Sequence, residues 1–143
     1  MSRRRPAQAG VTLIELMVVV TIIALFVALV GPALFKNVGK GRITAAKSQI
    51  ESFGTALGTY KLDVGTFPTT EQGLQALIIQ PTSTPATGNW KGPYLKPAVI
   101  RKDPWNHDYI YQNPGTHNTT SYVLYSPGPD GVPGNEDDIG NWQ

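Results

Sequence analysis

The chain has 143 residues, enough for one small domain and an appended segment, and a formal net charge of +2 at pH 7. Three of its twelve basic residues are Arg3, Arg4 and Arg5, and the remaining nine face ten acidic residues. No dense basic stripe is left to bind a phosphate backbone, so we expect no nucleic-acid partner. The absence of cysteine excludes a disulfide framework and a thiolate zinc site.

Residues 11–35 form an apolar segment long enough to cross a membrane. As a helix they would extend roughly 37 Å, more than the about 30 Å of a hydrocarbon core. Sixteen of these 25 residues are Leu, Ile, Val or Phe. Together they favour insertion by roughly 5 to 10 kcal/mol, which outweighs the cost of Glu15, at most about 3.5 kcal/mol. A cleavable secretory signal is the alternative, although its apolar part is normally about 7 to 15 residues. Basic residues flank both ends, so charge leaves the orientation open.

The helix is expected to continue beyond this segment to about Lys61. Pro32 removes one helical hydrogen bond, which predicts a kink there. Beyond it, apolar residues recur at every third or fourth position, the spacing of one helical stripe. They are Ile43, Ala46, Ile50, Phe53, Leu57 and Tyr60. Gly54 and Gly58 weaken this part of the helix but allow close approach by a neighbouring segment.

The distal half of the chain is rich in proline and glycine, which predicts short elements. Residues 67–78 are predicted to form a break and a short helix, with Thr69 and Gln72 at capping-box spacing. Residues 108–112 and 121–126 are β-branched and aromatic, which predicts two antiparallel strands. The expected fold class is therefore α+β. A long N-terminal helix, transmembrane and then amphipathic, would pack on a small antiparallel sheet followed by a C-terminal loop.

The acidic tail is the most informative candidate site. His107 and His117 have no partner at metal-ligand spacing, and no nucleophile–base arrangement stands out, so no enzyme is predicted. The tail, residues 126–142, contains four carboxylates and no basic residue: Asp130, Glu136, Asp137 and Asp138. A compact loop with hard oxygen donors suits Ca²⁺, although a solvated surface loop is the alternative.

Several stretches carry a family resemblance. Gly10, the run Val11-Thr12-Leu13-Ile14-Glu15 and the apolar helix after it resemble the class III signal of type IV pilins and type II secretion pseudopilins. Three later stretches look like the major pseudopilins, so that the resemblance covers nearly the whole chain. They are "YKLDVGTFPTTEQGLQAL", "DPWNHDYIY" and "GPDGVPGNEDDIGNW".

The resemblance implies a processing path and three parts of the chain. A prepilin peptidase would cut between Gly10 and Val11, removing a basic leader of residues 1–10, and methylate the new amine. Residues 11–35 would be the transmembrane and filament-core half of the helix. Residues 36–143 would be the globular domain, which includes the amphipathic half of the helix. The chain would cross the inner membrane once, with the leader cytoplasmic and the globular domain periplasmic.

The implied role is that of the major structural subunit of the pseudopilus. This homopolymer grows from the inner membrane and drives export of folded proteins across the outer membrane. The implied partners are copies of the chain itself, the prepilin peptidase, minor pseudopilins and the inner-membrane secretion platform. Glu15 matches the assembly glutamate of the family, and Pro32 matches its helix-breaking proline.

The resemblance also implies a structural Ca²⁺ site in the acidic tail. Its side-chain ligands would be Asp130, Asp137 and Asp138. Its backbone oxygens would come from Pro127, Val132 and Asn135.

Two other functions compete with this interpretation. A pilin of a type IV pilus commonly closes its C-terminal loop with a disulfide, which this chain cannot form because it has no cysteine. A membrane-anchored periplasmic binding domain that never polymerises would explain the apolar segment and the acidic loop. That second alternative leaves Gly10 and Glu15 without a role.

Overall fold

The computed structural model describes residues 10–143 except residues 84, 86 and 118, and the side chains of residues 33–36 are also outside the description. The chain divides into two compact units, Met1–Gly39 and Lys40–Gln143. The predicted domain boundary, after residue 35, falls just inside the first unit. Of the predicted leader, only Gly10 belongs to the described residues.

Helix α1 (Leu13–Val64) is the dominant element of the chain. Thr12 caps it, because the backbone N–H of Glu15 donates to Thr12 Oγ1 at 3.3 Å. Its N-terminal part has a mean hydropathy of 3.0 over 18 residues, none of them buried, and by length and composition it could cross a membrane. Pro32 lies inside α1, and the kink predicted there stays a prediction.

One face of the distal part of α1 supplies the core of the second unit. The predicted stripe is confirmed in most positions: Ala46, Ile50, Phe53, Leu57 and Tyr60 are all buried, and Ala56 joins them. Ile43 was predicted to belong to this stripe but is 40% exposed. Ala46 is the first buried residue of α1 in the described part of the chain. The layer that covers the helix therefore begins one turn later than the periodicity suggested.

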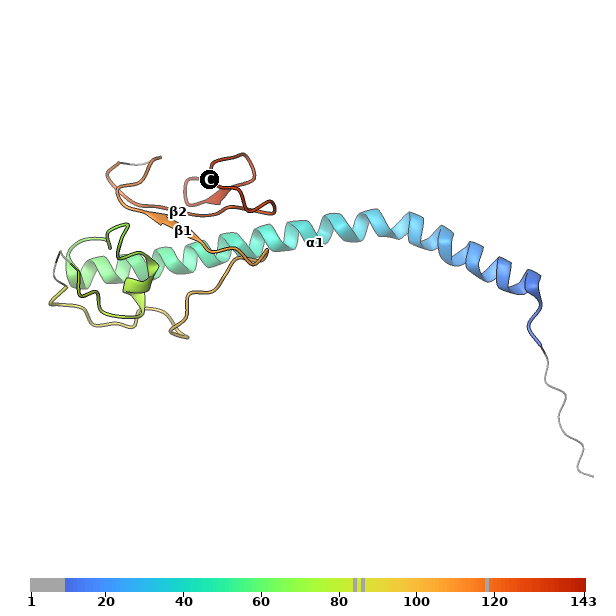
Figure 1. Cartoon of the computed structure of the whole chain (residues 1–143), viewed down its shortest axis with the longest axis horizontal. Coiled ribbons are helices and arrows are strands. Elements are labelled where there is room, and N and C mark those ends of the chain that lie inside the picture. Colours follow the sequence, from blue (N-terminus) through green and yellow to red (C-terminus); the bar gives the residue numbers. More distant parts are fainter. Residues whose placement is uncertain (1–9, 84, 86, 118) are drawn as a thin grey trace, which may run out of the picture. The chain divides into compact units, whose positions relative to one another are not determined.

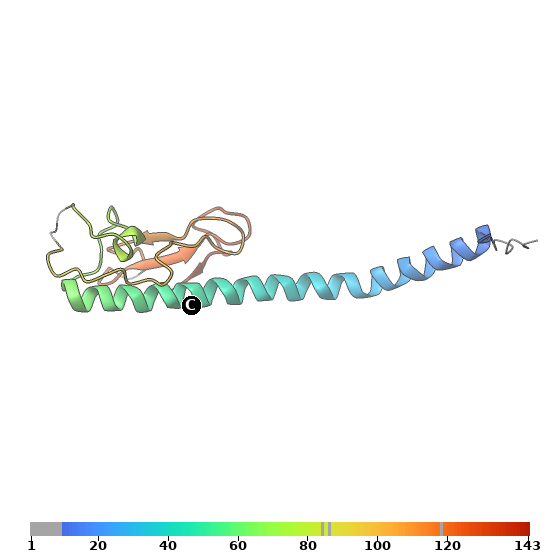
Figure 2. The ribbon, with the colours of Figure 1, turned by 90° about the horizontal axis from the view of Figure 1, so that it is seen from below.

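A three-stranded antiparallel sheet in the order β1-β2-β3 lies along this part of α1 (Figures 1 and 2). Strand β1 (Ile110–Gln112) pairs with β2 (Val123–Ser126), with Tyr111 opposite Leu124. Strand β3 (Ile139–Gly140) pairs with the end of β2. The two predicted strands are confirmed, although both are shorter than predicted. The third, only two residues long, was not predicted.

The predicted capping box exists, but the helix after it is not an α-helix. The backbone N–H of Thr69 donates to Gln72 Oε1 at 3.0 Å, and that of Gln72 donates to Thr69 Oγ1 at 3.2 Å. Gly73 follows with a φ of +56°, which interrupts the right-handed geometry. Only the 3₁₀ helix η1 (Leu74–Leu77) forms after this break.

Aromatic side chains complete the core between α1 and the sheet. Phe53 meets Tyr109 edge-on, with ring centroids 5.2 Å apart. The Tyr111 hydroxyl donates to the Pro68 carbonyl oxygen at 2.8 Å, whereas the buried Tyr109 hydroxyl has no hydrogen-bond partner among the described residues. Burial, and secondarily the charge of Asp103, raises the pKa of Tyr109 to about 12. Burial also raises the pKa of Tyr111 well above its usual range.

Two glycines of α1 provide a matched test of this packing. A Cβ at Gly54 would lie 3.2 Å from the Tyr122 hydroxyl oxygen, whereas one at Gly58 would meet no atom within 4 Å. We expect Gly58→Ala to stabilise the second unit by about 0.5 to 1 kcal/mol, because alanine is the better helix former. Gly54→Ala should gain less, since its methyl group crowds Tyr122. Thermal unfolding of the full chain in detergent, followed by near-ultraviolet circular dichroism, measures both, and equal gains would contradict this packing.

The two core tyrosines should respond differently to loss of the hydroxyl. Tyr111→Phe is expected to cost about 1 kcal/mol because it removes one of the two hydrogen bonds that the Pro68 carbonyl accepts, the other coming from the Asn113 side-chain amide. Tyr109→Phe should be close to neutral at pH 7, because its hydroxyl has no hydrogen-bond partner among the described residues. The folded state keeps the Tyr109 proton above pH 10, the ordinary tyrosine range, so folding stability is lost as the pH rises from about 10 to about 12. Tyr109→Phe should lessen this alkaline loss. Unfolding in urea between pH 7 and pH 11 checks both expectations, and an unchanged alkaline slope in Tyr109→Phe would refute the second.

Candidate functional site

The first candidate site lies at the start of α1. Gly10 and Val11 are exposed and precede the helix, so the predicted cleavage bond is accessible. Glu15 stands in the first turn of α1, where its negative charge faces the positive end of the helix dipole. Its side chain is exposed, and the ion pairs among the described residues do not include it. The structure thus presents Glu15 as a carboxylate without a basic partner in the described chain.

The second candidate site is the acidic loop, defined here as residues 127–138. Asp130 closes a local turn: its Oδ1 accepts the backbone N–H of Val132 at 2.9 Å, and its Oδ2 accepts the Asn135 side-chain amide at 2.7 Å. Asn135 in turn accepts the backbone N–H of Asp137 at its Oδ1, at 3.0 Å. The loop therefore folds around its own side chains, a pattern typical of Asx turns.

Asp138 is the buried carboxylate of the acidic loop. It is 6% exposed, and its Oδ2 accepts the backbone N–H of Gly134 at 2.8 Å. Its Oδ1 is buried and has no hydrogen-bond partner among the described residues. A buried carboxylate oxygen without a partner is unfavourable, and a bound cation is one way to satisfy it. Burial, and secondarily the charge of Asp138, raises the pKa of Tyr125 nearby.

The predicted ligand set is only partly brought together. Within the described residues, no group of three or more His, Asp or Glu side chains is placed to hold a metal ion. Asp137 is exposed, and both carboxylate oxygens of Asp130 accept hydrogen bonds from the loop itself. The donors still fit Ca²⁺ in kind, because all are oxygens and Asp138 Oδ1 has no hydrogen-bond partner in the described part of the chain.

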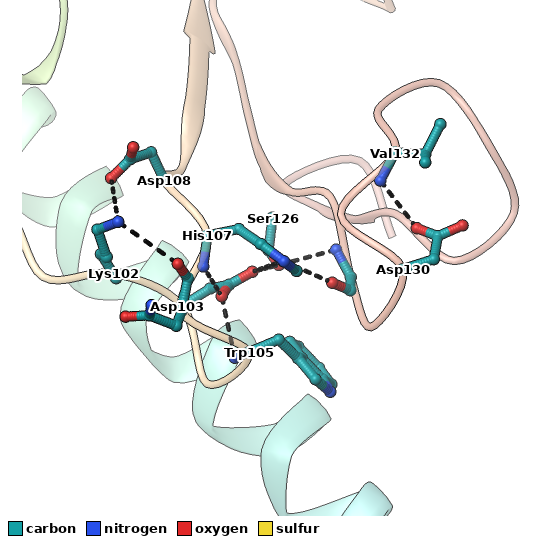
Figure 3. A network of polar contacts seen from close by, with 10 residues as sticks. Lys102, Asp103, Trp105, His107, Asp108, Ser126, Asp130 and Val132 are labelled. Carbon is teal, nitrogen blue, oxygen red and sulfur yellow. Dashed lines mark hydrogen bonds and ion pairs between the residues drawn. The ribbon is translucent and has the colours of Figure 1, made fainter.

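The structure also contains a polar network that the sequence did not reveal (Figure 3). The side chain of Asp103 is fully buried, and its Oδ1 accepts the backbone N–H groups of Trp105 and His107 at 3.0 and 2.7 Å. Its Oδ2 accepts the Ser126 hydroxyl at 2.5 Å. An aspartate followed by proline, as here at Pro104, favours a turn, and this was the available sequence signal.

This network is not a nucleophile–base triad. Ser126 is completely buried and donates its proton to Asp103 rather than to His107. The ring of His107 is partly exposed and lies in a loop. His117, the other histidine, stacks on Trp142 with ring centroids 4.2 Å apart.

These features define a class of protein. An exposed apolar helix follows a short Gly-Val-Thr segment and carries a glutamate in its first turn. Its continuation supplies the core of a small α+β unit with an acidic C-terminal loop. This combination is that of a membrane-anchored subunit of the type IV pilin-like class.

Comparison with known proteins identifies the family within this class. Residues 33–142 match the family "Type II secretion system (T2SS), protein G", and residues 5–31 match the "Prokaryotic N-terminal methylation motif". The chain belongs to the type II secretion system protein G family, whose members are major pseudopilins, the structural subunits of the pseudopilus. The predicted resemblance and fold class are confirmed.

The similarity extends over nearly the whole chain. The type II secretion system core protein G of Pseudomonas aeruginosa is 44% identical, over 97% of this chain and 98% of that protein. The core protein G of Escherichia coli is 45% identical, over 98% of this chain and 94% of that protein. The crystal structure of the major pseudopilin from enterohaemorrhagic Escherichia coli superposes with a TM-score of 0.67 at 41% identity, covering 76% of this chain and 93% of that one.

Proposed function

We propose that this chain, once processed, polymerises from the inner membrane into the pseudopilus that drives export of folded proteins across the outer membrane. A prepilin peptidase would cut between Gly10 and Val11 and methylate the new amine. The leader would be cytoplasmic and the second unit periplasmic. Minor pseudopilins and the inner-membrane secretion platform would be the further partners. The observation that carries this proposal is the position of Glu15 in the first turn of an exposed apolar helix, without an ion-pair partner among the described residues.

Cleavage would create a basic partner for Glu15. The new α-amine of Val11 would be largely protonated at neutral pH, because the reference pKa of such a group is about 7.7 to 8.0. A protonated amine and a carboxylate are each unfavourable in lipid, and pairing offsets part of that penalty. If the amine of one copy meets Glu15 of the next, staggered helix packing becomes favourable. The exposed apolar surface of α1 would then be covered by lipid or by other copies.

Replacing Glu15 should separate insertion from assembly. Glu15→Ala is expected to enter the membrane and to be cleaved normally, because the apolar segment is unchanged. It should fail to form filaments, since removing one partner of a pair in lipid costs about 3 to 5 kcal/mol. The readouts are membrane fractionation, mass spectrometry of the mature N-terminus and electron microscopy of filaments in cells that express the secretion system.

Glu51→Ala is the matched control, because Glu51 is an exposed carboxylate on the second-unit part of the same helix. It should insert, mature and assemble as the unchanged chain does. Filaments of normal abundance in Glu15→Ala would refute the pairing. A mature chain that does not begin at methylated Val11 would instead refute the processing step, and a fully processed chain that never assembles would favour the anchored binding domain.

We also propose that the acidic loop holds a structural Ca²⁺. Asp130, Asp137 and Asp138 would supply carboxylate oxygens, and Pro127, Val132 and Asn135 would supply backbone oxygens. The ion would neutralise a loop that has no basic residue and satisfy the buried Asp138 Oδ1. The loop precedes and leads into β3, so its order would support the edge of the sheet.

Calcium should therefore raise the melting temperature of the full chain in detergent. The stabilisation should approach about 2.7 kcal/mol at a hundredfold excess over Kd. Asp138→Asn should abolish the response to Ca²⁺, whereas Glu136→Gln, in the same loop but outside the ligand set, should keep it. Thermal unfolding in chelator, in Ca²⁺ and in Mg²⁺ makes the comparison. An unchanged melting temperature in millimolar Ca²⁺ would contradict the proposal and indicate that the loop is ordinary solvated surface.

A further inference from the structure

The acidic loop is tied to the rest of the second unit through Gly128. Its backbone N–H donates to Ser126 Oγ at 3.1 Å, and its carbonyl oxygen contacts His107 Nδ1 at 3.1 Å. Both backbone groups of this residue are thus held by side chains that lie outside the loop. Figure 3 shows the two side chains, His107 and Ser126, beside Asp103.

Asp103 connects the two side chains that hold Gly128. Its Oδ2 accepts the Ser126 hydroxyl, which leaves an Oγ lone pair free to accept the Gly128 N–H. Its Oδ1 accepts the backbone N–H of His107, which fixes the point of the backbone from which the imidazole side chain extends. Asp103 has no lysine or arginine within ion-pair distance among the described residues, and its carboxylate is satisfied by these donors. Such a buried polar cluster specifies one arrangement more strictly than apolar packing would.

The imidazole must act as the donor to Gly128. A carbonyl oxygen only accepts, so the contact at 3.1 Å requires a proton on Nδ1. The other side of the ring lies under the loop: a Cβ at Gly131 would be 2.8 Å from His107 Nε2. Gly131 has a φ of +71°, so its conformation also favours glycine. His107 therefore contacts the loop at two points, one polar and one by close packing.

Gly128 also places the far end of the loop. A Cβ at Gly128 would overlap the backbone carbonyl of Asp137, and the φ of Gly128 is +70°. The backbone of Asp137 therefore packs directly on Gly128. Anything that fixes Gly128 limits where Asp137 and its neighbour Asp138 can lie.

We propose that Asp103, His107 and Ser126 are positioning residues that hold the acidic loop in one conformation through Gly128 and thereby raise its affinity for a divalent cation. They touch no cation and act only through the loop backbone. The effect on affinity rests on the proposed calcium function, whereas the ordering of the loop does not. The two effects can therefore be measured separately.

Variants at His107 test the proposal without removing the buried carboxylate. His107→Asn retains an amide N–H near the position of Nδ1, whereas His107→Phe retains a ring but has no donor. His117→Phe is the matched control, because His117 stacks on Trp142 outside the network. All three are made in the full chain in detergent, so that the membrane-anchored form is the one measured.

The first readout is amide hydrogen exchange of residues 127–138 in the presence of chelator. His107→Phe should lower protection at Gly128 and across the loop by roughly fivefold, the contribution of one hydrogen bond. His107→Asn should restore most of it, and His117→Phe should leave it unchanged. The second readout is the Kd for Ca²⁺ by calorimetry, which His107→Phe should raise by about tenfold or more and which His107→Asn should bring back towards the original value.

The outcomes separate this inference from the calcium proposal. If the unchanged chain binds no Ca²⁺ but His107→Phe still loosens the loop, the calcium proposal fails and the positioning role stands. If His107→Phe matches the unchanged chain in loop protection, the positioning role is wrong. It is equally wrong if His117→Phe loosens the loop to the same extent, or if His107→Asn is no better than His107→Phe.

Discussion

The burial of one stripe of α1 is the interaction on which the second unit depends. The strands are two to four residues long, and a sheet of that size has too little hydrogen bonding and too little apolar area to persist alone. Phe53 and Tyr60 on α1 supply the surfaces that Tyr109 and Tyr94 cover, both edge-on. The helix therefore organises the sheet rather than the reverse. Upstream, no described residue of the same helix is buried, and such a large exposed apolar surface is typical of a helix that contacts lipid or other chains.

Features that depend on local spacing were predictable from the sequence. The stripe, the capping box and the two aromatic strands each follow from a period or a fixed offset between residues. The sequence was a poor guide to features that tertiary contacts determine. Ile43 has the period of the stripe but lies beyond the layer that covers it, and the open space at Gly58, unlike Gly54, depends on where Tyr122 ends. Strand β3 is too short to carry a pattern, and its two residues are a strand only because β2 lies beside them.

The same distinction applies to the candidate sites. Gly10 and Glu15 were recognisable as candidate site residues because a fixed number of residues separates them at the start of one helix. The carboxylates of the acidic loop were recognisable by composition, but their hydrogen bonds were not, since Asp130 and Asp138 accept backbone N–H groups that only the folded turn presents. The Asp103 network joins residues more than twenty positions apart through Ser126 and Gly128. The spacing of residues along the sequence does not indicate such a long-range contact, which is apparent only in the folded structure.

Glu15 and Asp138 both lack a partner for at least one carboxylate oxygen among the described residues, but only Asp138 is buried. Asp138 Oδ1 is buried, so the lack of a partner lowers the stability of the folded subunit. A cation bound to this oxygen would raise the free energy of unfolding of a single subunit. Glu15 is exposed on an apolar helix, so its missing partner affects the fold of the second unit little. Its penalty grows when the helix is surrounded by lipid, and a second chain can relieve it. Under the proposed function, the loop would therefore stabilise the subunit before it assembles, and Glu15 would select the neighbour that it joins.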